Sequence, residues 1–288
     1  MVATMKHVLT LFKLRIGVAI VLTALTGLAV TPGHSPTNVQ ILILTLAVLL
    51  SASAAGGFNH YFDWDLDARM LRTQNRPFVV GSLPHSPWWL PLFASMMFLP
   101  CVAVMLAVNV TSGLFVFLGA FFYGGVYTFW LKRRTWLNIV IGGLAGSFSI
   151  LAGSAAIDPD LGPVPLWLAM VLFLWTPPHF WSLAITLRDD YQSARIPMLP
   201  VVVGDVVTSR VILGHTVLLV AASIMPFFHG LGWIYLLGVV LGGGLFLYRS
   251  ILLVRNPVPL AARANFFASI QQLALFLGGA CLDPLLRS

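Results

Sequence analysis

The chain has 288 residues, of which 59% are hydrophobic and only 9% are charged, and its mean hydropathy is +0.93. So little polar surface cannot cover a water-soluble globule, which excludes the soluble classes of protein. The net charge of +7 comes from basic residues whose positions are typical of an orientation signal in a membrane protein. This explanation of the charge disfavours nucleic-acid binding.

Nine stretches are long and apolar enough to cross a bilayer, which takes about 20 residues. Alternating strand patterns are absent, and backbone groups in lipid must bond within their own segment, so the stretches are predicted to be helices. No linker divides the chain, so residues 1–288 are expected to form one all-α domain. The predicted spans are residues 16–33, 39–60, 88–108, 113–130, 139–156, 164–187, 211–228, 231–248 and 264–282.

The basic residues alternate between the two sides of these spans. Fifteen of the sixteen lysines and arginines fall into five groups of three, at the N-terminus and after spans two, four, six and eight, and Arg287 is the exception. The positive-inside rule therefore predicts a cytoplasmic N-terminus, and nine spans place the C-terminus outside.

The end of the second span reads NHYFDWDLDARMLRTQNRP, from residue 59 to residue 77. Asn59, Asp63 and Asp67 are spaced i, i+4 and i+8, so on a helix they share one face, with Asp65 nearly opposite. Two carboxylates stacked at the end of a membrane helix repel each other unless a cation lies between them. The stripe therefore indicates a site for a divalent cation.

Three interpretations of this segment compete. A calcium-binding loop needs a glycine where the chain has Ala68 and a glutamate where it has Gln74. Alternatively, the acids pair with Arg69, Arg72 and Arg76 in a solvated loop. In the third interpretation the acids hold magnesium, and the arginines, chiefly Arg72 and Arg76, bind the phosphate groups of a ligand. Only the third explains both signs of charge, and it is the prediction adopted.

Two further charged segments are expected on the same face of the membrane. Lys132 and Arg133 end the fourth span, where they either set topology or bind phosphate. The loop after span six contains LRDDYQSARIPMLP, in which Asp189 and Asp190 are predicted to supply a second metal-holding group. Adjacent aspartates cannot share one helical face, which leaves open the choice between the two.

Small residues and prolines mark particular places in the spans. Gly142 with Gly146, and Gly238 with Gly242, have the spacing that lets helices approach closely. The double proline that begins at Pro177 removes two backbone donors and is predicted to break or bend span six.

The strings DWDLDARMLRTQNRP, YTFWLKRRTWLNIVIGG, WTPPHFWSLAI and DDYQSARIPMLPVV resemble the UbiA superfamily of intramembrane prenyltransferases. The similarity is greatest to the members that transfer a farnesyl group to haem. It implies nine helices around a central cavity, with Mg²⁺ and the diphosphate of farnesyl diphosphate held at a cytoplasmic mouth in the bacterial plasma membrane. The catalytic residues carried over are Asn59, Asp63, Asp67 and Asp190.

The same resemblance implies an acceptor, haem B, whose vinyl group attacks an allylic cation and whose product cation captures water. Haem iron favours a histidine ligand, and His60 and His179 are the candidates. Membrane lipid and a haem-handling protein are the expected partners. The aromatic side chains expected to wall the reaction chamber are Phe121, Phe122, Tyr123, Tyr127, Phe180 and Trp181.

Two alternatives stay open from the sequence. One is a UbiA-type prenyltransferase that acts on an aromatic quinone precursor and needs no haem pocket. The other is a membrane transporter, which would distribute ionisable groups along its depth and onto both faces.

Overall fold

The computed structural model describes residues 2–287, with side chains from residue 7 to residue 286. Every regular element within them is a helix. In chain order these are α1 (Val2–Leu11), α2 (Leu14–Ala29), α3 (Asn38–Phe62), α4 (Trp64–Asp67), α5 (Trp89–Ala107), α6 (Val110–Phe121), the π-helix η1 (Phe122–Leu131), α7 (Asn138–Gly142), α8 (Leu144–Ala155), α9 (Pro163–Thr186), α10 (Arg188–Ser193), α11 (Leu199–Phe228), α12 (Trp233–Arg255) and α13 (Pro259–Arg287).

Eight helical stretches of the described chain are long and apolar enough to cross a membrane, and α2, with 16 residues, is a shorter apolar helix. Helices α6 and η1 form one of these spans, and α7 and α8 form another. Each of the nine predicted spans overlaps one of these helices, so the prediction of an all-helical membrane protein is confirmed. Arg287, the exception to the pattern of basic residues, lies beyond the residues whose side chains the structure describes.

Two local predictions around span six need correction. The predicted break is wrong, because helix α9 continues through its double proline; in a membrane helix, neighbouring helices and Ser or Thr side chains can satisfy the backbone groups that proline frees. The hydroxyl of Ser182 also bonds the carbonyl of Pro178 at 2.6 Å. The expected long loop after α9 is mostly helical, since α10 and the start of α11 fill it. Helix α11 bends at Gly204, whose φ of 80° favours glycine.

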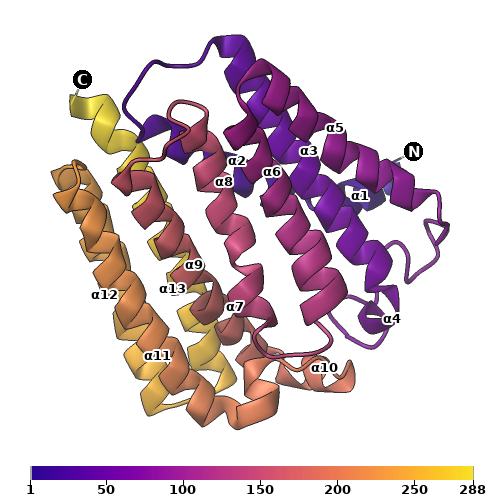
Figure 1. Ribbon diagram of the computed structural model, residues 1–288. Helices are drawn as coiled ribbons and strands as arrows, with labels where there is room; N and C mark the ends of the chain where they lie inside the picture. The colour runs from indigo at the N-terminus through magenta and orange to yellow at the C-terminus, as the bar shows by residue number, and fades with distance from the viewer. Residues whose placement is uncertain (1, 288) are drawn as a thin grey trace.

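The helices stand side by side in a single bundle (Figure 1). Helices α2 and α8 meet so closely that a Cβ on Gly27 would lie 2.0 Å from the carbonyl oxygen of Ile150. Gly238 has the same role between α12 and α13, where a Cβ would lie 2.5 Å from the carbonyl oxygen of Leu275. Gly146 differs from the prediction, because a Cβ there would meet nothing within 4 Å.

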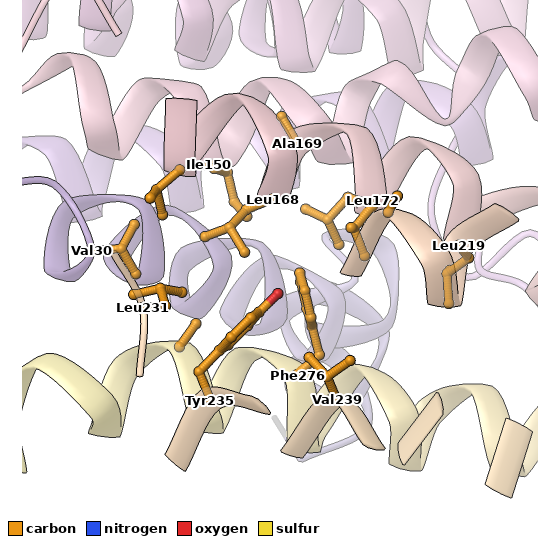
Figure 2. Close-up of a cluster of buried hydrophobic side chains, with 14 of the residues drawn as sticks. Val30, Ile150, Leu168, Ala169, Leu172, Leu219, Leu231, Tyr235, Val239 and Phe276 are labelled. Atoms are coloured by element: carbon orange, nitrogen blue, oxygen red, sulfur yellow. The ribbon is translucent and has the colours of Figure 1, made fainter. Parts of the chain in front are cut away.

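One buried apolar cluster joins α8, α9, α11, α12 and α13 (Figure 2). Tyr235 and Phe276 are fully buried at its centre, with ring centroids 5.9 Å apart. The Tyr235 hydroxyl donates to the carbonyl of Ser223 at 2.6 Å, which satisfies a polar group that lipid could not. Packing in this half of the bundle fixes the position of α9.

The short helices α4 and α10 lie at the same end of the bundle in Figure 1, and the connection from α2 to α3 lies at the other end. A second apolar cluster joins α4, α10 and the loops beside them through Leu66, Met70, Tyr191 and Ile196. Segments far apart in the sequence therefore close one end of the bundle together.

Candidate active site

Asn59, Asp63 and Asp67 form a continuous stripe from the end of α3 into α4. The N–H of Asp63 donates to the carbonyl of Asn59 at 3.0 Å, and that of Asp67 to the carbonyl of Asp63 at 2.8 Å. The helical spacing therefore continues across the junction, as the sequence predicted. The three residues are 3%, 0% and 2% exposed. Asp65 does not belong to this buried stripe, since its side chain is 35% exposed and pairs with Arg133.

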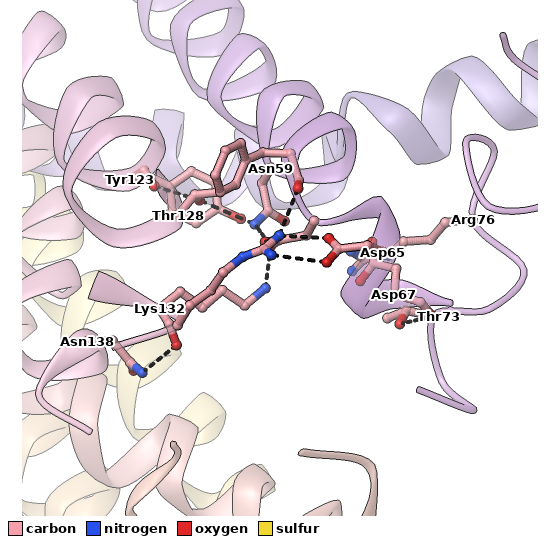
Figure 3. Close-up of polar contacts among 12 residues, drawn as sticks. Asn59, Asp65, Asp67, Thr73, Arg76, Tyr123, Thr128, Lys132 and Asn138 are labelled. Carbon is pink, nitrogen blue, oxygen red and sulfur yellow. Dashed lines mark hydrogen bonds and ion pairs between the residues drawn. The ribbon is translucent and has the colours of Figure 1, made fainter. Parts of the chain in front are cut away.

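Each member of the stripe has a cationic partner (Figure 3). The pairs are Asn59 with Lys13, Asp63 with Lys132, and Asp67 with Arg76. The Lys13 ammonium donates to Asn59 Oδ1 at 2.6 Å, and the Arg76 guanidinium donates to Asp67 Oδ2 at 2.6 Å. Asp63 Oδ2 also accepts from Asn59 Nδ2 at 2.6 Å, whereas the buried Asp63 Oδ1 has no hydrogen-bond partner. Lys13, Asn59, Asp63 and Lys132 thus form one polar network, and Asp67 with Arg76 forms a separate ion pair in the same stripe.

Lys13 reaches this network from the junction between α1 and α2. Its backbone is left-handed, with φ 48° and ψ 41°, a conformation that costs a non-glycine residue about 1–3 kcal/mol and collects at functional sites. The bend aims the side chain into the bundle, where Nζ also donates to the Tyr123 hydroxyl at 2.9 Å. A strained backbone here therefore carries a charged group to the stripe.

The π-helix η1 brings aromatic and basic groups to the same place. Its wider turn is seen where the N–H of Lys132 donates to the carbonyl of Tyr127 at 2.9 Å, five residues back. The rings of Tyr123 and Tyr127 stack with centroids 5.7 Å apart. Thr128 accepts from Asn59 Nδ2 at 3.2 Å, which joins η1 to α3.

The charges around the stripe shift its ionisable groups. Burial lowers the pKa of the Lys13 ammonium well below its usual value, and the positive charges of Arg76 and Lys132 lower it further. Burial raises the pKa of the Asp67 carboxyl despite the nearby Arg76. Partial burial of Asp65 opposes ionisation, but hydrogen bonds from Arg133 and its charge outweigh this and lower the pKa of Asp65. Both buried groups would gain from an added charge of opposite sign.

A polar cavity of about 210 Å³ opens beside the stripe. Four cationic side chains line it, with Asp67 as the one lining carboxylate: Lys13, Arg72, Arg76 and Lys132. So many positive groups around a small volume suit a ligand with several negative charges. The cavity is therefore chemically suited to a diphosphate.

An apolar chamber of about 240 Å³ adjoins this cavity, and six residues line both spaces: Lys13, Ile16, Tyr123, Gly142, Thr176 and Phe180. Its walls are mostly glycine, alanine and other apolar residues of α2, α3, α6, α8 and α9. Gly146 lines it, and the absence of a Cβ there leaves open space. A ligand with a polyanionic head and a long apolar tail matches the two spaces together.

A sequence model of the UbiA prenyltransferase family matches residues 20–274. The chain belongs to this family. It is 54% identical over 287 residues to Protoheme IX farnesyltransferase 2 of Paramagnetospirillum magneticum (strain ATCC 700264 / AMB-1), with 99% of both chains covered. It is 45% identical over 274 residues to Protoheme IX farnesyltransferase 1 of the same organism, which covers 94% of this chain and 96% of the relative. The resemblance expected from the sequence is confirmed.

Solved structures share the fold. A structure of digeranylgeranylglyceryl phosphate synthase matches with a TM-score of 0.81 at 18% identity, over 98% of each chain. A UbiA homolog from Archaeoglobus fulgidus bound to DMAPP and Mg²⁺ matches with a TM-score of 0.70 at 14% identity, over 93% of this chain and 98% of that one. At these identities the likeness shows the common helical architecture.

The stripe has the donor set that a magnesium ion prefers. Asn59, Asp63 and Asp67 offer only oxygen ligands, and the buried Asp63 Oδ1 lacks a hydrogen-bond partner. Among the described residues there is no group of three or more His, Cys, Asp or Glu side chains placed to hold a metal ion. Two carboxylates and an amide oxygen fit Mg²⁺, because this ion is usually bound by one or two carboxylates and its remaining ligands are substrate phosphates and water.

Some of the predicted phosphate-binding and metal-binding residues line the polar cavity, and the others do not. Arg72, Arg76 and Lys132 line the polar cavity, whereas Arg133 forms two hydrogen bonds with the carboxylate of Asp65, at 3.0 and 2.7 Å. Asp189 is exposed. Asp190 binds backbone N–H groups of the loop after α4. Neither aspartate is among the residues that line the polar cavity.

The expected aromatic walls are met in part. Tyr123 and Phe180 line both spaces, and Tyr127 lines the polar cavity. Trp181 is fully buried and faces His215 with ring centroids 5.2 Å apart. Phe121 lines a separate apolar groove of about 230 Å³ between α3, α5 and η1, and Phe122 packs on Phe148.

Both histidine candidates for haem are buried, in different surroundings. His60 is 3% exposed, and its Nδ1 has no hydrogen-bond partner. His179 is stacked between Trp175 and Phe266, with centroid distances of 4.1 and 4.5 Å, and its Nδ1 bonds the Ser269 hydroxyl at 2.7 Å. Neither residue lines the polar cavity or the apolar chamber, so a haem ligand among them stays a prediction.

Sequence reasoning missed Lys13 as a site residue, because a lysine before the first span is explained by membrane orientation alone. It also missed Trp175 and Thr176, which line the apolar chamber. No local spacing links these residues to the stripe, since Lys13 and Asn59 are 46 positions apart. The one available signal was the position of Trp175 and Thr176 directly before the double proline.

Proposed function

We propose that this protein transfers the farnesyl group of farnesyl diphosphate to a vinyl group of haem B, with addition of water and release of diphosphate. It would act as a single membrane-embedded domain. The observation that carries the proposal is that a cation-lined cavity and an apolar chamber lie side by side and share six lining residues. The 54% identity to a protein named as a protoheme IX farnesyltransferase supports the choice of donor and acceptor.

Diphosphate binding would begin at the four cationic side chains of the polar cavity. The planar guanidinium groups of Arg72 and Arg76 would donate to phosphate oxygens as bidentate hydrogen-bond donors. The Lys13 and Lys132 ammonium groups would act as point charges. These charges stabilise the negative charge that grows on the bridging oxygen as the carbon–oxygen bond breaks. The diphosphate is thereby made a better leaving group.

The stripe would hold Mg²⁺ through the oxygens of Asn59, Asp63 and Asp67. When bound, the metal ion supplies further charge neutralisation for the departing diphosphate. Lys13, Lys132 and Arg76 pair with the stripe and also line the polar cavity, so they could donate to a diphosphate bound there. Asp63 Oδ1 is buried and accepts no hydrogen bond, so it is an oxygen that could bind the metal ion.

The farnesyl cation would form at the boundary between the two spaces. Tyr123 and Phe180 lie at that boundary, and Trp175 lines the chamber beyond it. Electron-rich ring faces stabilise a cation, and apolar walls limit attack by water before the acceptor reacts. A vinyl carbon of haem then bonds to the first carbon of the farnesyl group. The new cation beside the porphyrin ring takes a hydroxyl from water, which releases one proton.

His60 and His179 stay as proposed haem ligands, with different support. The Nδ1 of His60 is buried and unpaired, whereas that of His179 is already bonded to Ser269. His60 also follows Asn59 in α3, close to the stripe. The structure therefore favours His60 of the two.

The active end of the bundle would face the cytoplasm of a bacterial plasma membrane. The ion-paired groups of the stripe, α4, α10 and their loops gather at this end, and the basic residues between spans follow the positive-inside pattern. This one-ended distribution disfavours a transporter, which would need polar groups along a path through the membrane. A haem-handling partner could then supply the acceptor.

The test is incubation of membranes containing the protein with haem B, farnesyl diphosphate and Mg²⁺, followed by mass analysis of the pigment. The expected product is haem plus one farnesyl group and one hydroxyl group. Asp63→Asn and Asp67→Asn should each lower turnover at least about 100-fold, while the control Asp65→Asn, outside the cavity, keeps most activity. Full turnover by either stripe variant would contradict the proposal. Prenylation of an aromatic quinone precursor, with haem unchanged, would favour the alternative enzyme.

A further inference from the structure

The loop after α4 delivers Arg72 and Arg76 to the polar cavity, yet it contains no long helix. Its own turns are held by backbone bonds such as the one from the N–H of Thr73 to the carbonyl of Met70 at 3.0 Å. The Thr73 hydroxyl also donates to the carbonyl of Asp67 at 3.0 Å. These local bonds shape the loop, but they do not fix it against the rest of the bundle.

Helix α10 supplies that attachment through one carboxylate. Asp190 Oδ1 accepts from the N–H of Leu71 at 3.2 Å, and Asp190 Oδ2 accepts from the N–H of Arg72 at 3.2 Å. One turn later, the Ser193 hydroxyl lies 3.0 Å from the carbonyl oxygen of Arg69 and 2.8 Å from that of Asp190, so its hydrogen is shared between the loop and α10. Two side chains of α10 therefore bind the loop backbone at three points, about 120 positions away in the sequence.

Apolar packing places the same two segments together. Met70 of the loop and Tyr191 of α10 are 3% and 5% exposed, and both belong to the cluster that closes this end of the bundle. Both also line the polar cavity. The bonds from Asp190 thus lie at a packed contact directly behind the cavity wall.

We propose that Asp190 is a positioning residue, which fixes the loop so that the guanidinium groups of Arg72 and Arg76 face the diphosphate. The inference rests on the proposed function only in naming diphosphate as the ligand. An ionised carboxylate accepts on both oxygens, so it can bind two successive N–H groups at once. An asparagine would turn one of those acceptors into an NH₂ donor that opposes a backbone N–H.

This role differs from metal ligation, which the sequence had suggested for Asp190. Both of its oxygens are directed at the loop backbone, and the residue is not among those that line the polar cavity. The stripe holds three oxygen-bearing side chains without it. Its effect on the reaction is therefore expected to pass through Arg72 and Arg76.

The first test measures the loop itself, by amide hydrogen exchange on the purified protein without ligands. Asp190→Asn should speed exchange in the peptide spanning residues 69–76, and Ser193→Ala should do so more weakly. Asp189→Asn removes an equal charge from the same helix and should leave this peptide unchanged. Wild-type exchange in the Asp190→Asn protein would overturn the inference, whatever the substrate is.

The second test measures binding of inorganic pyrophosphate and, separately, of Mn²⁺ as a probe for Mg²⁺. Asp190→Asn should weaken pyrophosphate binding about tenfold, and adding it to a protein that already carries Arg72→Gln and Arg76→Gln should cause no further loss. Mn²⁺ affinity without pyrophosphate should be unchanged. Loss of Mn²⁺ affinity, or additive losses of pyrophosphate affinity, would overturn the positioning role. A wild-type protein that binds no pyrophosphate would instead contradict the proposed function.

Discussion

Lys132 and Arg133 are adjacent in the sequence, but their side chains have different partners and surroundings. The Lys132 side chain is 10% exposed and pairs with Asp63, whose side chain is 0% exposed. The Arg133 side chain is 35% exposed and pairs with Asp65, which is also 35% exposed. Replacing each basic residue by methionine removes the charge and keeps an apolar chain of similar length. The two replacements should therefore have very different effects on stability.

The expected magnitudes follow from burial. Removing one partner of a buried ion pair costs about 3–5 kcal/mol, because the remaining charge is left uncompensated. Asp63 would keep the hydrogen bond from Asn59 at 2.6 Å and the more distant Arg133 at 3.8 Å, so Lys132→Met should fall near the lower end, at about 3 kcal/mol. Arg133→Met should cost about 1 kcal/mol or less, as exposed pairs do.

The assay is reversible unfolding of the purified protein in mixed micelles with increasing SDS, followed by the fluorescence of its nine tryptophans. Asp63→Asn in the Lys132→Met protein removes the uncompensated charge and should recover most of the lost free energy of unfolding. Equal losses for Lys132→Met and Arg133→Met would refute the reasoning. So would a double variant that recovers nothing.

Three further predictions concern packing, donor choice and haem. Gly153→Ala should lower the free energy of unfolding by about 1–3 kcal/mol, because its Cβ would lie 1.7 Å from a backbone oxygen of α2. The control Gly214→Ala adds a Cβ with nothing within 4 Å and should raise the free energy of unfolding by up to about 1 kcal/mol. Equal SDS midpoints for the two variants would contradict this prediction. Gly146→Leu should fill the apolar chamber and favour geranyl over farnesyl diphosphate at least tenfold in competition assays, and an unchanged product ratio would show that the chamber does not hold the donor tail. His60→Ala should abolish the Soret band of protein purified with haem, while His179→Ala keeps it and unfolds at lower SDS; the reverse pattern would make His179 the ligand.

Much of the fold follows from local properties of the sequence. A membrane span depends on the length and polarity of one segment, so the nine helices could be predicted without knowledge of their neighbours. The stripe of Asn59, Asp63 and Asp67 could be predicted for the same reason, because i+4 spacing places side chains on one helical face. The pattern of the basic residues likewise predicted which end of the bundle carries charge, although their individual partners were not accessible.

The tertiary structure alone decided which charges meet. Lys13 contacts Asn59 across 46 positions and Tyr123 across 110, and no local period connects such residues. The sequence predicted Asp190 and Asp189 as a metal-holding group, and only the packing of α10 on the loop after α4 shows that the Asp190 carboxylate accepts from backbone N–H groups. Lys132 and Arg133 have similar charges, and only the wider turn of η1 and the burial of Asp63 separate their roles. Composition and helical period are properties of one segment, whereas the partner of a charge depends on where several segments pack.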